Sequence, residues 1–293
     1  MRTGIDEMVE YLKRKEETAD GAFTWEIIIV DDGSKDATAV IAVTEYTLVY
    51  GADRVRLLKC FKNGGKGAAV RKGVMRARGA LVLMADADGA TRFSDFGALS
   101  EAIASLSPPL AFAIGSRAHL FKDGKGKRSG LRRLLSWGFH SVVGVLLGVS
   151  DIEDTQCGFK LWTRLAAKGL FDVLHIERWA FDVELVYLAA RKGVKMIEVP
   201  VEWKEIAGSK LDPTSASLQM ARDLIVVRLA YLCEYRNKRF IESVCVKSQK
   251  MGPHLQQCKR NKNVFDSPPS PLPTPHSPLP PLSLLVGWWK LDG

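Results

Sequence analysis

Two aspartates one residue apart follow a continuous apolar run in the segment LVLMADADGA. Asp86 and Asp88 come where a buried strand is expected to end, and Gly89 follows them at once. A hard cation such as Mg²⁺ or Mn²⁺ takes oxygen ligands, keeps several waters and bridges one or two carboxylates to a diphosphate. The pattern therefore indicates either a divalent metal site with Asp86 and Asp88 as ligands or a polar turn that closes the strand.

A second apolar run also ends in carboxylates. In EIIIVDDGSKD, Asp31 and Asp32 follow the apolar residues directly, and a Gly-Ser pair comes next. Such a strand end can place an aspartate against a nucleobase or ribose, while Ser34 caps the next helix. As a capping signal alone the pattern is common. Beside a second acidic strand end, it favours a nucleotide-binding edge.

A glycine-rich loop, KNGGKGAAVRKG (62–73), leads into an expected helix. Backbone N–H groups at a helix N-terminus attract phosphate, and Lys66 would add a point charge there. The P-loop pattern G-x-x-x-x-G-K-[ST] is not met, because Ala68 stands where the hydroxyl that holds Mg²⁺ would be required. The loop thus argues for phosphate contact and against a P-loop nucleotidase.

The elements that must position these residues alternate along the chain. Apolar strand patterns and helical patterns at this spacing predict βαβ units with right-handed crossovers and ligand sites at the carboxyl ends of the strands. We therefore expect an α/β fold, a Rossmann-like and mostly parallel sheet flanked by helices, with both acidic segments on one edge. The opening seventeen residues read as an amphipathic helix. Expected strands are 26–30, 54–58, 80–85, 111–115, 156–163 and 195–203, and expected helices are 37–49, 66–78, 95–106, 131–149, 179–193 and 214–236.

Composition bounds the class of protein. The chain has 293 residues, of which 46% are hydrophobic, enough for one large α/β domain with appendages. Its formal charge of +9 is uneven, because residues 236–293 hold nine Lys or Arg against three acids. Because that excess lies in a tail of low order, it is weak evidence for nucleic-acid binding, and we expect no nucleic-acid partner. The five cysteines form no CxxC pair, which fits a reducing compartment better than a disulfide framework or a zinc site.

The C-terminal part changes character. The segment SPPSPLPTPHSPLPPLS holds eight of the 13 prolines. We expect a folded domain over residues 1–239 and a basic, Pro-rich, disordered tail without a packed role over residues 240–293. No apolar run reaches the about 18–20 residues of a membrane-spanning helix.

The order VDDGS, N-x-G-K-G and D-A-D-G over residues 25–90 resembles the inverting family 2 glycosyltransferases of nucleotide-sugar-binding fold. Four further segments make the sequence similar to the dolichyl-phosphate β-glucosyltransferases of the endoplasmic reticulum: GSRAHL (115–120), DTQCGFKLWTR (154–164), ERWAFDVEL (177–185) and EIAGSKLDP (205–213). The resemblance makes residues 1–239 a glycosyltransferase domain. It implies inverting transfer of glucose from UDP-glucose to dolichyl phosphate, for protein N-glycosylation, with Mg²⁺ or Mn²⁺ as cofactor.

The resemblance also implies which residues bind the donor. Asp31 or Asp32 would contact the uracil–ribose portion of UDP-glucose, with Lys66 nearby. Asp86 and Asp88 would lie at the metal and diphosphate, with Asp88 as the direct ligand.

For the acceptor phosphate, the resemblance implies a set of cations. They are Arg117, Arg132, Arg133 and Lys210, although Arg117 also fits a surface ion pair and Lys210 an ordinary loop lysine. Asp154 takes the place of the family's proposed catalytic acidic residue. Because a phosphate nucleophile is already anionic, with a second pKa of about 6, Asp154 need only orient it.

Supporting residues are expected around Asp154. Gln156 lies beside it in sequence, and Trp179 and Asp182 follow in the 177–185 segment. Each has an ordinary alternative, a core position for Trp179 and a solvated helix face for Asp182.

A long-chain isoprenoid acceptor must be met at a bilayer surface. The segment 131–149 begins with Arg132 and Arg133 and continues as an apolar body, which suits a helix in the membrane interface. A core helix is the alternative. The resemblance implies peripheral association with the cytosolic face of the endoplasmic reticulum membrane.

The sequence departs from the family at its start. Relatives begin with a membrane anchor and a strand that carries V-V-P-x-Y-N-E, whereas this sequence opens at the helix expected after that strand. The missing strand would be central in the sheet, between the strands that end at Asp31 and Asp86. Either the chain is truncated, or residues 5–12 or tail residues fill the position.

These departures leave other functions open. The alternatives are a dolichyl-phosphate mannosyltransferase that uses GDP-mannose, a polysaccharide synthase, and a weaker option, a sugar-nucleotide pyrophosphorylase. A further alternative is an inactive truncated form that acts only as a membrane- or partner-binding protein.

Overall fold

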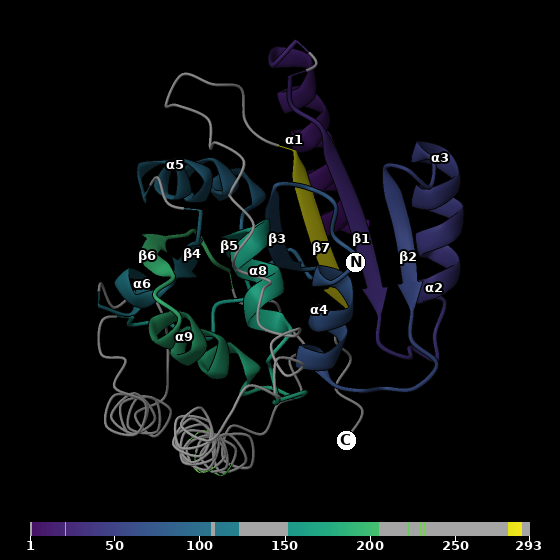
Figure 1. Cartoon of the computed structure of the whole chain (residues 1–293). Helices are drawn as coiled ribbons and strands as arrows, with labels where there is room; N and C mark the ends of the chain where they lie inside the picture. Colours follow the sequence, from purple (N-terminus) through teal and green to yellow (C-terminus); the bar gives the residue numbers. More distant parts are fainter. Residues whose placement is uncertain are drawn as a thin grey trace, which may run out of the picture.

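A computed structural model describes residues 2–20, 22–106, 109–122, 152–204 and 281–288, together with Arg222, Ile225, Leu229 and Tyr231. At its centre a seven-stranded sheet has the order β2-β1-β7-β3-β5-β4-β6 (Figure 1). Strand β5 is antiparallel to β3 and β4, and the other pairs are parallel, which confirms the predicted fold class. The strands are β1 (Trp25–Asp31), β2 (Val55–Lys59), β3 (Leu81–Asp86), β4 (Ala111–Ser116), β5 (Lys160–Thr163), β6 (Lys195–Pro200) and β7 (Leu282–Trp288).

Helices cover both faces of this sheet (Figure 1). The predicted helix over 37–49 is confirmed, with a π-helical middle. The described helices are α1 (Arg2–Thr18), α2 (Thr38–Ile41), the π-helix η1 (Ala42–Thr47), α3 (Leu48–Tyr50), α4 (Lys66–Val74), the 3₁₀-helix η2 (Phe93–Asp95), α5 (Phe96–Leu106), α6 (Ala118–Lys122), α8 (Arg164–Phe171) and α9 (Phe181–Arg191).

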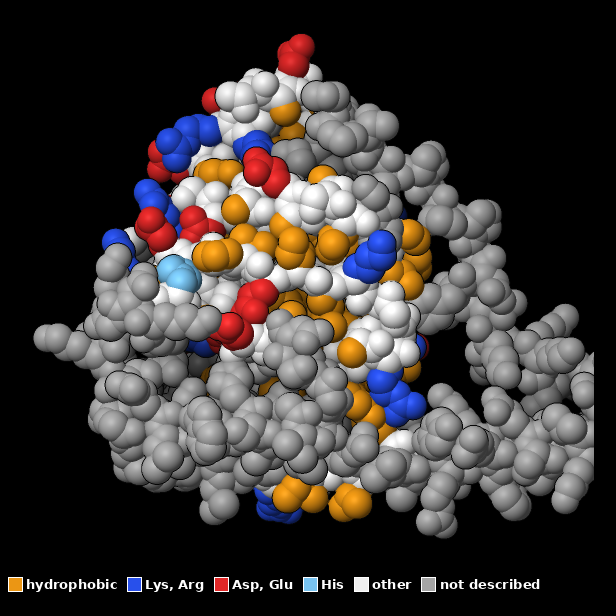
Figure 2. All heavy atoms as spheres, turned by 90° about the vertical axis from the view of Figure 1, so that its left-hand side faces the viewer, with side chains coloured by type: hydrophobic (Ala, Val, Ile, Leu, Met, Phe, Trp, Pro, Cys, Tyr) orange, Lys and Arg blue, Asp and Glu red, His pale blue; other side chains and the backbone are white. Residues whose placement is uncertain are grey.

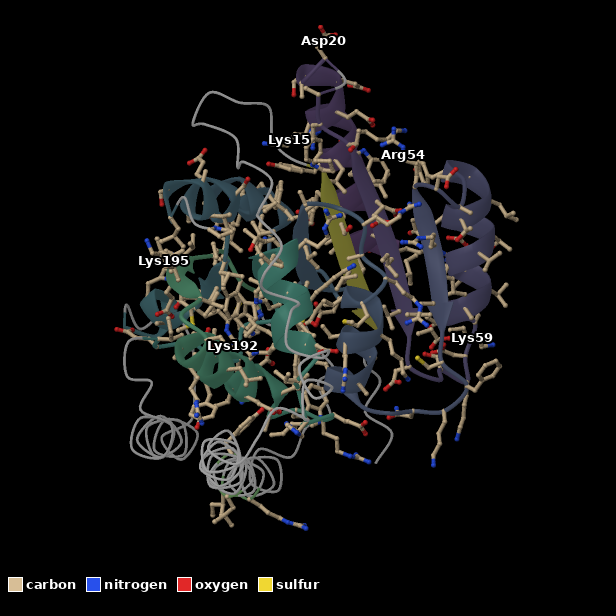
Figure 3. All side chains as sticks on the ribbon, in the orientation of Figure 1. Lys15, Asp20, Arg54, Lys59, Lys192 and Lys195 are labelled. Carbon is tan, nitrogen blue, oxygen red and sulfur yellow. The ribbon has the colours of Figure 1, made fainter. Side chains whose placement is uncertain are left out.

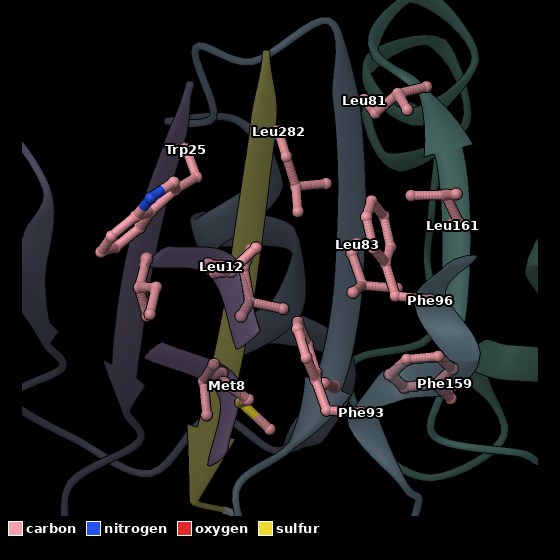
Figure 4. Close-up of a cluster of buried hydrophobic side chains, with 14 of the residues drawn as sticks. Met8, Leu12, Trp25, Leu81, Leu83, Phe93, Phe96, Phe159, Leu161 and Leu282 are labelled. Carbon is pink, nitrogen blue, oxygen red and sulfur yellow. The ribbon is translucent and has the colours of Figure 1, made fainter. Parts of the chain in front are cut away.

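Helix α1 covers one face because its apolar residues recur at helical spacing. Ile5, Met8, Val9 and Leu12 form a single stripe and are nearly inaccessible to solvent. Figure 4 shows Met8 and Leu12 packed among side chains of β3, β7 and the η2–α5 segment. On the opposite face, α4, α8 and α9 pack over a second core. Since both faces are covered, the inner strands are mostly apolar, as predicted, with a few buried polar residues among them.

The expectation for the end of the tail is wrong. Residues 282–288, placed in a disordered tail, form the central strand β7, parallel to both β1 and β3. Tail residues therefore fill the position expected to be vacant, whereas residues 5–12 belong to α1. The physical signal was the run LSLLVGW after Pro281, which is apolar apart from Ser283, as expected for a doubly buried strand. The prolines that precede this run are typical of disordered segments, and for that reason the sequence predicted a disordered tail.

Other expectations lie outside the described residues. They are the helix over 131–149, most of the helix over 214–236, the tail residues 240–280, and the site residues Arg132, Arg133 and Lys210. Within the described part of the chain, no helix has the length and apolar character needed to span a bilayer. Figure 2 shows the left-hand side of Figure 1, where charged side chains of both signs surround a group of hydrophobic ones.

Candidate active site

The two acidic strand ends lie on one edge of the sheet. Asp31 ends β1 and Asp86 ends β3, and both are in register with the end of β7, opposite Trp288 and Gly287 respectively. In Figure 3 this edge is on the side of Lys59, the last residue of β2, while Asp20 lies at the far end of the molecule. Since the three strands are parallel, the prediction of a shared edge is confirmed.

Asp31 and Asp32 have different surroundings. Asp31 is fully buried; its Oδ1 accepts from the Ser34 N–H at 2.8 Å, and its Oδ2 is buried with no hydrogen bond among the described residues. Asp32 instead accepts from the N–H groups of Gly64 at 3.0 Å and Gly65 at 2.8 Å. An unsatisfied buried acceptor is unfavourable by about 1–3 kcal/mol. Asp31 is thus the candidate to accept a hydrogen bond from a donor group of a ligand, whereas Asp32 holds the glycine-rich loop.

Ser34 does not cap the following helix, which corrects a sequence expectation. The Thr38 N–H at the start of α2 donates to Asp36 Oδ1 at 3.0 Å. The Ser34 N–H instead donates a hydrogen bond to Asp31 Oδ1, which closes a turn directly after β1. The VDDGS segment is therefore a carboxylate-stabilised turn, and Asp36 supplies the helix contact.

Lys66 begins α4 and points inward. Its Nζ lies 2.8 Å from Asp86 Oδ1 and 5.9 Å from the centre of the Trp179 ring. Burial alone would lower the pKa of Lys66, but Asp86 and Asp182 outweigh it and the pKa is raised. Lys66 therefore stays protonated and links the glycine-rich loop to the acidic end of β3.

The loop fits closely because it contains glycines. A β-carbon at Gly65 would lie 2.6 Å from the Glu177 carbonyl oxygen, and one at Gly67 would lie 2.6 Å from that of Ile176. Gly65 also has φ of +94°, which other residues rarely adopt. The loop thus packs directly on the ERWAF segment, and this contact brings Trp179 to Lys66.

Asp86 and Asp88 are suited to hold a divalent cation. Asp88 is exposed, and its Oδ1 accepts from the Ala90 N–H at 2.9 Å. Although the residue is exposed, the surrounding chain removes part of the water from its carboxylate. This desolvation, reinforced by the charge of Asp86, raises the pKa of Asp88. A cation between the two carboxylates would relieve that repulsion. Among the described residues no group of three or more His, Cys, Asp or Glu could hold a metal, so phosphate and water oxygens would complete the coordination.

Arg117 and Asp154 form a bidentate ion pair. Arg117 Nε donates to Asp154 Oδ2 at 2.7 Å and Nη2 donates to Oδ1 at 2.9 Å. The N–H groups of Arg117 and Gln156 also donate to this carboxylate, at 3.0 Å and 3.3 Å. Burial alone would raise the pKa of Asp154, but Arg117 outweighs it and the pKa is lowered. Asp154 is thus an anion whose acceptor positions are occupied, which suits orientation better than proton removal.

Two further residues hold this pair. Glu198 of β6 accepts from the N–H groups of Glu153 at 2.9 Å and Asp154 at 2.8 Å. The Arg117 guanidinium carbon lies 5.4 Å from the centre of the Trp203 ring. Glu198 escaped the sequence analysis, since one acidic residue in a short strand gives no signal of its own.

A buried ion pair lies behind the site. Lys160 is fully buried, and its Nζ donates to Asp182 Oδ1 at 2.6 Å and to the Cys157 carbonyl oxygen. Burial raises the pKa of Asp182, against the opposing charges of Lys160 and Lys66. Asp182 is therefore an interior group and not a solvated helix residue. The sequence analysis missed Lys160, although a lysine within the apolar run GFKLWT was an available signal.

Most of the predicted site residues thus come together. The glycine-rich loop joins Asp32, Lys66 and Trp179, and Lys66 reaches Asp86. The charge of Asp86 also contributes to the raised pKa of Arg117, which ties the acidic edge to the Arg117–Asp154 pair.

A mostly parallel sheet with an acidic edge is the arrangement expected of a nucleotide-sugar-binding glycosyltransferase. Residues 4–160 match the model of glycosyl transferase family 2. Two curated relatives are named dolichyl-phosphate beta-glucosyltransferase. The *Homo sapiens* one is 50% identical over 231 residues, 78% of this chain and 70% of the relative. The one from Dictyostelium discoideum is 48% identical over 230 residues, and this match covers 78% of this chain and 69% of the relative. The chain therefore belongs to glycosyl transferase family 2, and within it to the dolichyl-phosphate β-glucosyltransferases.

A solved structure agrees on the fold. Glucosyl-3-phosphoglycerate synthase from *Mycobacterium tuberculosis*, crystallised with Mn²⁺, UDP and glucosyl-3-phosphoglycerate, superposes with a TM-score of 0.50 at 14% identity. The match covers 73% of this chain and 81% of that one. At this identity the likeness concerns the fold alone.

Proposed function

We propose that this protein transfers glucose from UDP-glucose to dolichyl phosphate with inversion, giving dolichyl β-glucosyl phosphate for protein N-glycosylation. The names of its relatives support this activity. The observation that carries it is the position of Asp86. Its carboxylate contacts Lys66 of the glycine-rich loop on one side and lies against Gly158, which follows Asp154 in the chain, on the other.

The donor would bind along the acidic edge. The unsatisfied Oδ2 of Asp31 would accept a hydrogen bond from the uracil or ribose. Asp32 and Lys66 would fix the glycine-rich loop beside it. Asp86 and Asp88 would hold Mg²⁺ or Mn²⁺, which would neutralise charge on the departing diphosphate.

The transfer would be a single displacement. A phosphate oxygen of the acceptor forms the bond to the anomeric carbon while the bond from that carbon to the UDP oxygen breaks, and UDP leaves with the electron pair. The acceptor phosphate is already anionic near neutral pH, because its second pKa is about 6. Approach of two anions is the main barrier, so the role assigned to Arg117, oriented by Asp154, is electrostatic. Arg132, Arg133 and Lys210 are proposed to add positive charge at the acceptor.

The acceptor places the reaction at a membrane. We propose peripheral association with the cytosolic face of the endoplasmic reticulum, through residues 131–149. Flotation with vesicles tests this: Trp137→Glu together with Leu146→Glu should abolish association. If the double variant floats as the unchanged protein does, the interfacial role is wrong.

A transfer assay tests the activity. Purified protein is given dolichyl phosphate in detergent with radiolabelled UDP-glucose or GDP-mannose, with Mg²⁺ or with EDTA. We expect labelled lipid only when the donor is UDP-glucose and Mg²⁺ is present. Labelled lipid from GDP-mannose instead would identify a mannosyltransferase. A folded protein that fails to bind UDP-glucose would contradict the proposal and favour an inactive form.

A further inference from the structure

Strand β7 is central in the sheet, although it is the last of the described strands along the chain. All seven of its residues pair with β1, from Trp25 opposite Leu282 to Asp31 opposite Trp288. Six of them also pair with β3. Withdrawing β7 would leave the facing backbone groups of β1 and β3 without partners in the interior, which is strongly unfavourable.

The side chains of β7 fill both cores. Leu282, Leu284 and Val286 lie on the face covered by α1, and Leu285 lies on the face covered by α4. All four are at most 2% exposed. Figure 4 shows Leu282 in the same cluster as Leu12 of α1. The strand therefore supplies a layer that the two helices pack against.

One polar residue sets the register of this strand. The Ser283 hydroxyl donates to Glu26 Oε1 and accepts from the N–H groups of Gly79 at 2.6 Å and Arg78 at 3.1 Å. Glu26 is also paired with Arg56 and Arg78. A slip by one residue would place a leucine against these groups and turn every side chain to the other face.

The neighbouring backbone is shaped around β7. A β-carbon at Gly79 would lie 2.4 Å from the Ser283 nitrogen, and one at Gly73 would lie 3.2 Å from Leu285 Cδ2. Because Gly79 and Gly73 have no side chain, the segment that leads into β3 and helix α4 can both pack directly against β7. The slot between β1 and β3 thus combines backbone pairing, two apolar walls and a matched hydroxyl site.

We propose that this slot, defined by β1, β3, Glu26, Gly73 and Gly79, is a strand-binding site, with residues 282–288 as its ligand. The same segment supplied as a separate peptide will occupy it in parallel register. The slot recognises an extended, uncharged and mostly apolar segment of seven residues with a hydroxyl at its second position. The mode is β-strand addition by insertion between two strands. This binding is independent of sugar transfer, so a failed transfer assay leaves it standing.

Peptide exchange in the full chain tests the proposal. A protease site inserted after Pro273 allows the C-terminal fragment to be released from the covalent chain. The cut protein is unfolded in urea and refolded with an excess of fluorescent peptide covering residues 281–293. We expect the peptide to co-elute with the refolded protein, and Ser283→Leu and Leu285→Asp peptides to compete at least about tenfold less well, as one lost buried contact of about 1.4 kcal/mol implies.

Hydrogen exchange on the uncut protein gives a second readout. Amides of residues 282–288 should exchange at least about 100-fold more slowly than in the free peptide, and those of β1 should be protected to a similar degree. Exchange of this segment at the rate of the free peptide would overturn the proposal. Exclusion of the wild-type peptide from refolded protein, or equal competition by the Ser283→Leu peptide, would also overturn it.

Discussion

Gly158 lies so close to Asp86 that a β-carbon at Gly158 would fall 2.0 Å from Asp86 Oδ2. The obstructing atom is the end of a side chain, so the fold can tolerate the substitution if Asp86 moves. Gly158→Ala should therefore leave the melting temperature nearly unchanged while lowering glucose transfer at least about tenfold, or about 1.4 kcal/mol in the barrier.

Gly97→Ala is the matched control for that substitution. A β-carbon at Gly97, within α5, would meet nothing nearer than Tyr11 Oη at 3.6 Å. Its transfer rate should equal that of the unchanged protein. Full activity of Gly158→Ala would show that the position of Asp86 is not critical.

Asp154→Asn tests whether Asp154 orients Arg117 or removes a proton. The variant should lose about 3–5 kcal/mol of unfolding free energy, because a buried arginine is left poorly paired. A rise in KM for dolichyl phosphate is also expected, without a new ionisation in the pH dependence of kcat. Urea unfolding and steady-state kinetics measure both effects.

The double variant Arg117→Gln with Asp154→Asn supplies the comparison. Since removing both partners leaves no unpaired charge, it should lose less stability than the two single variants summed. Strict additivity would mean that the bidentate pair is energetically unimportant. Near-normal turnover of Asp154→Asn with intact UDP-glucose binding would remove this carboxylate from the reaction.

Asp88→Asn tests the divalent cation. Calorimetric titration with UDP-glucose should show affinity that requires Mn²⁺ or Mg²⁺ in the unchanged protein and is at least about tenfold weaker in the variant, a loss of about 1.4 kcal/mol. Asp20→Asn makes the same chemical change at an exposed position at the opposite end of the molecule (Figure 3) and should bind normally. Equal loss in both variants would exclude a specific role for Asp88.

Glu26 should make the fold sensitive to acid. Burial alone would raise the pKa of Glu26, but hydrogen bonds from Ser283 and Arg78 lower it below its ordinary value of 4.5. Because the pKa is lower in the folded than in the unfolded chain, this stabilisation is present above that value and is lost as pH falls through the folded pKa.

Thermal unfolding between about pH 7 and about pH 3 measures the effect. Glu26→Gln should be less stable than the unchanged protein at neutral pH and should lose less of its stability on acidification. Glu17→Gln, at an exposed position on α1, is the control and should follow the unchanged protein. Parallel curves for Glu26→Gln and the unchanged protein would contradict the role assigned to Glu26.

The sequence predicted the edge of the site but not its interior. Asp31, Asp32, Asp86 and Asp88 follow apolar runs, and parallel strands bring such ends together by topology alone. Which carboxylate faces a ligand depends on tertiary contacts. Asp32 accepts hydrogen bonds from Gly64 and Gly65, whereas one oxygen of Asp31 has no hydrogen bond within the described part of the chain. No local sequence pattern separates the two residues.

Strand β7 and Lys160 escaped prediction for related reasons. The pairing of β7 with β1 joins residues far apart in the chain, and the apolar run of β7 does not reveal which strands it pairs with. Lys160 is stable in the interior because Asp182 lies 2.6 Å away, a contact between β5 and α9 that periodicity does not encode. In both cases the structure depends on a contact with a residue or strand that is distant in the sequence, and the local segment does not reveal that contact.

The stereochemistry of the product tests the account most directly. UDP-glucose carrying ¹³C at the anomeric carbon is incubated with the protein, a short-chain dolichyl phosphate and Mg²⁺, and the lipid product is examined by NMR. A single displacement across the acidic edge predicts a β-linked glucosyl phosphate. An α-linked product, or no lipid product from protein that binds UDP-glucose, would contradict it.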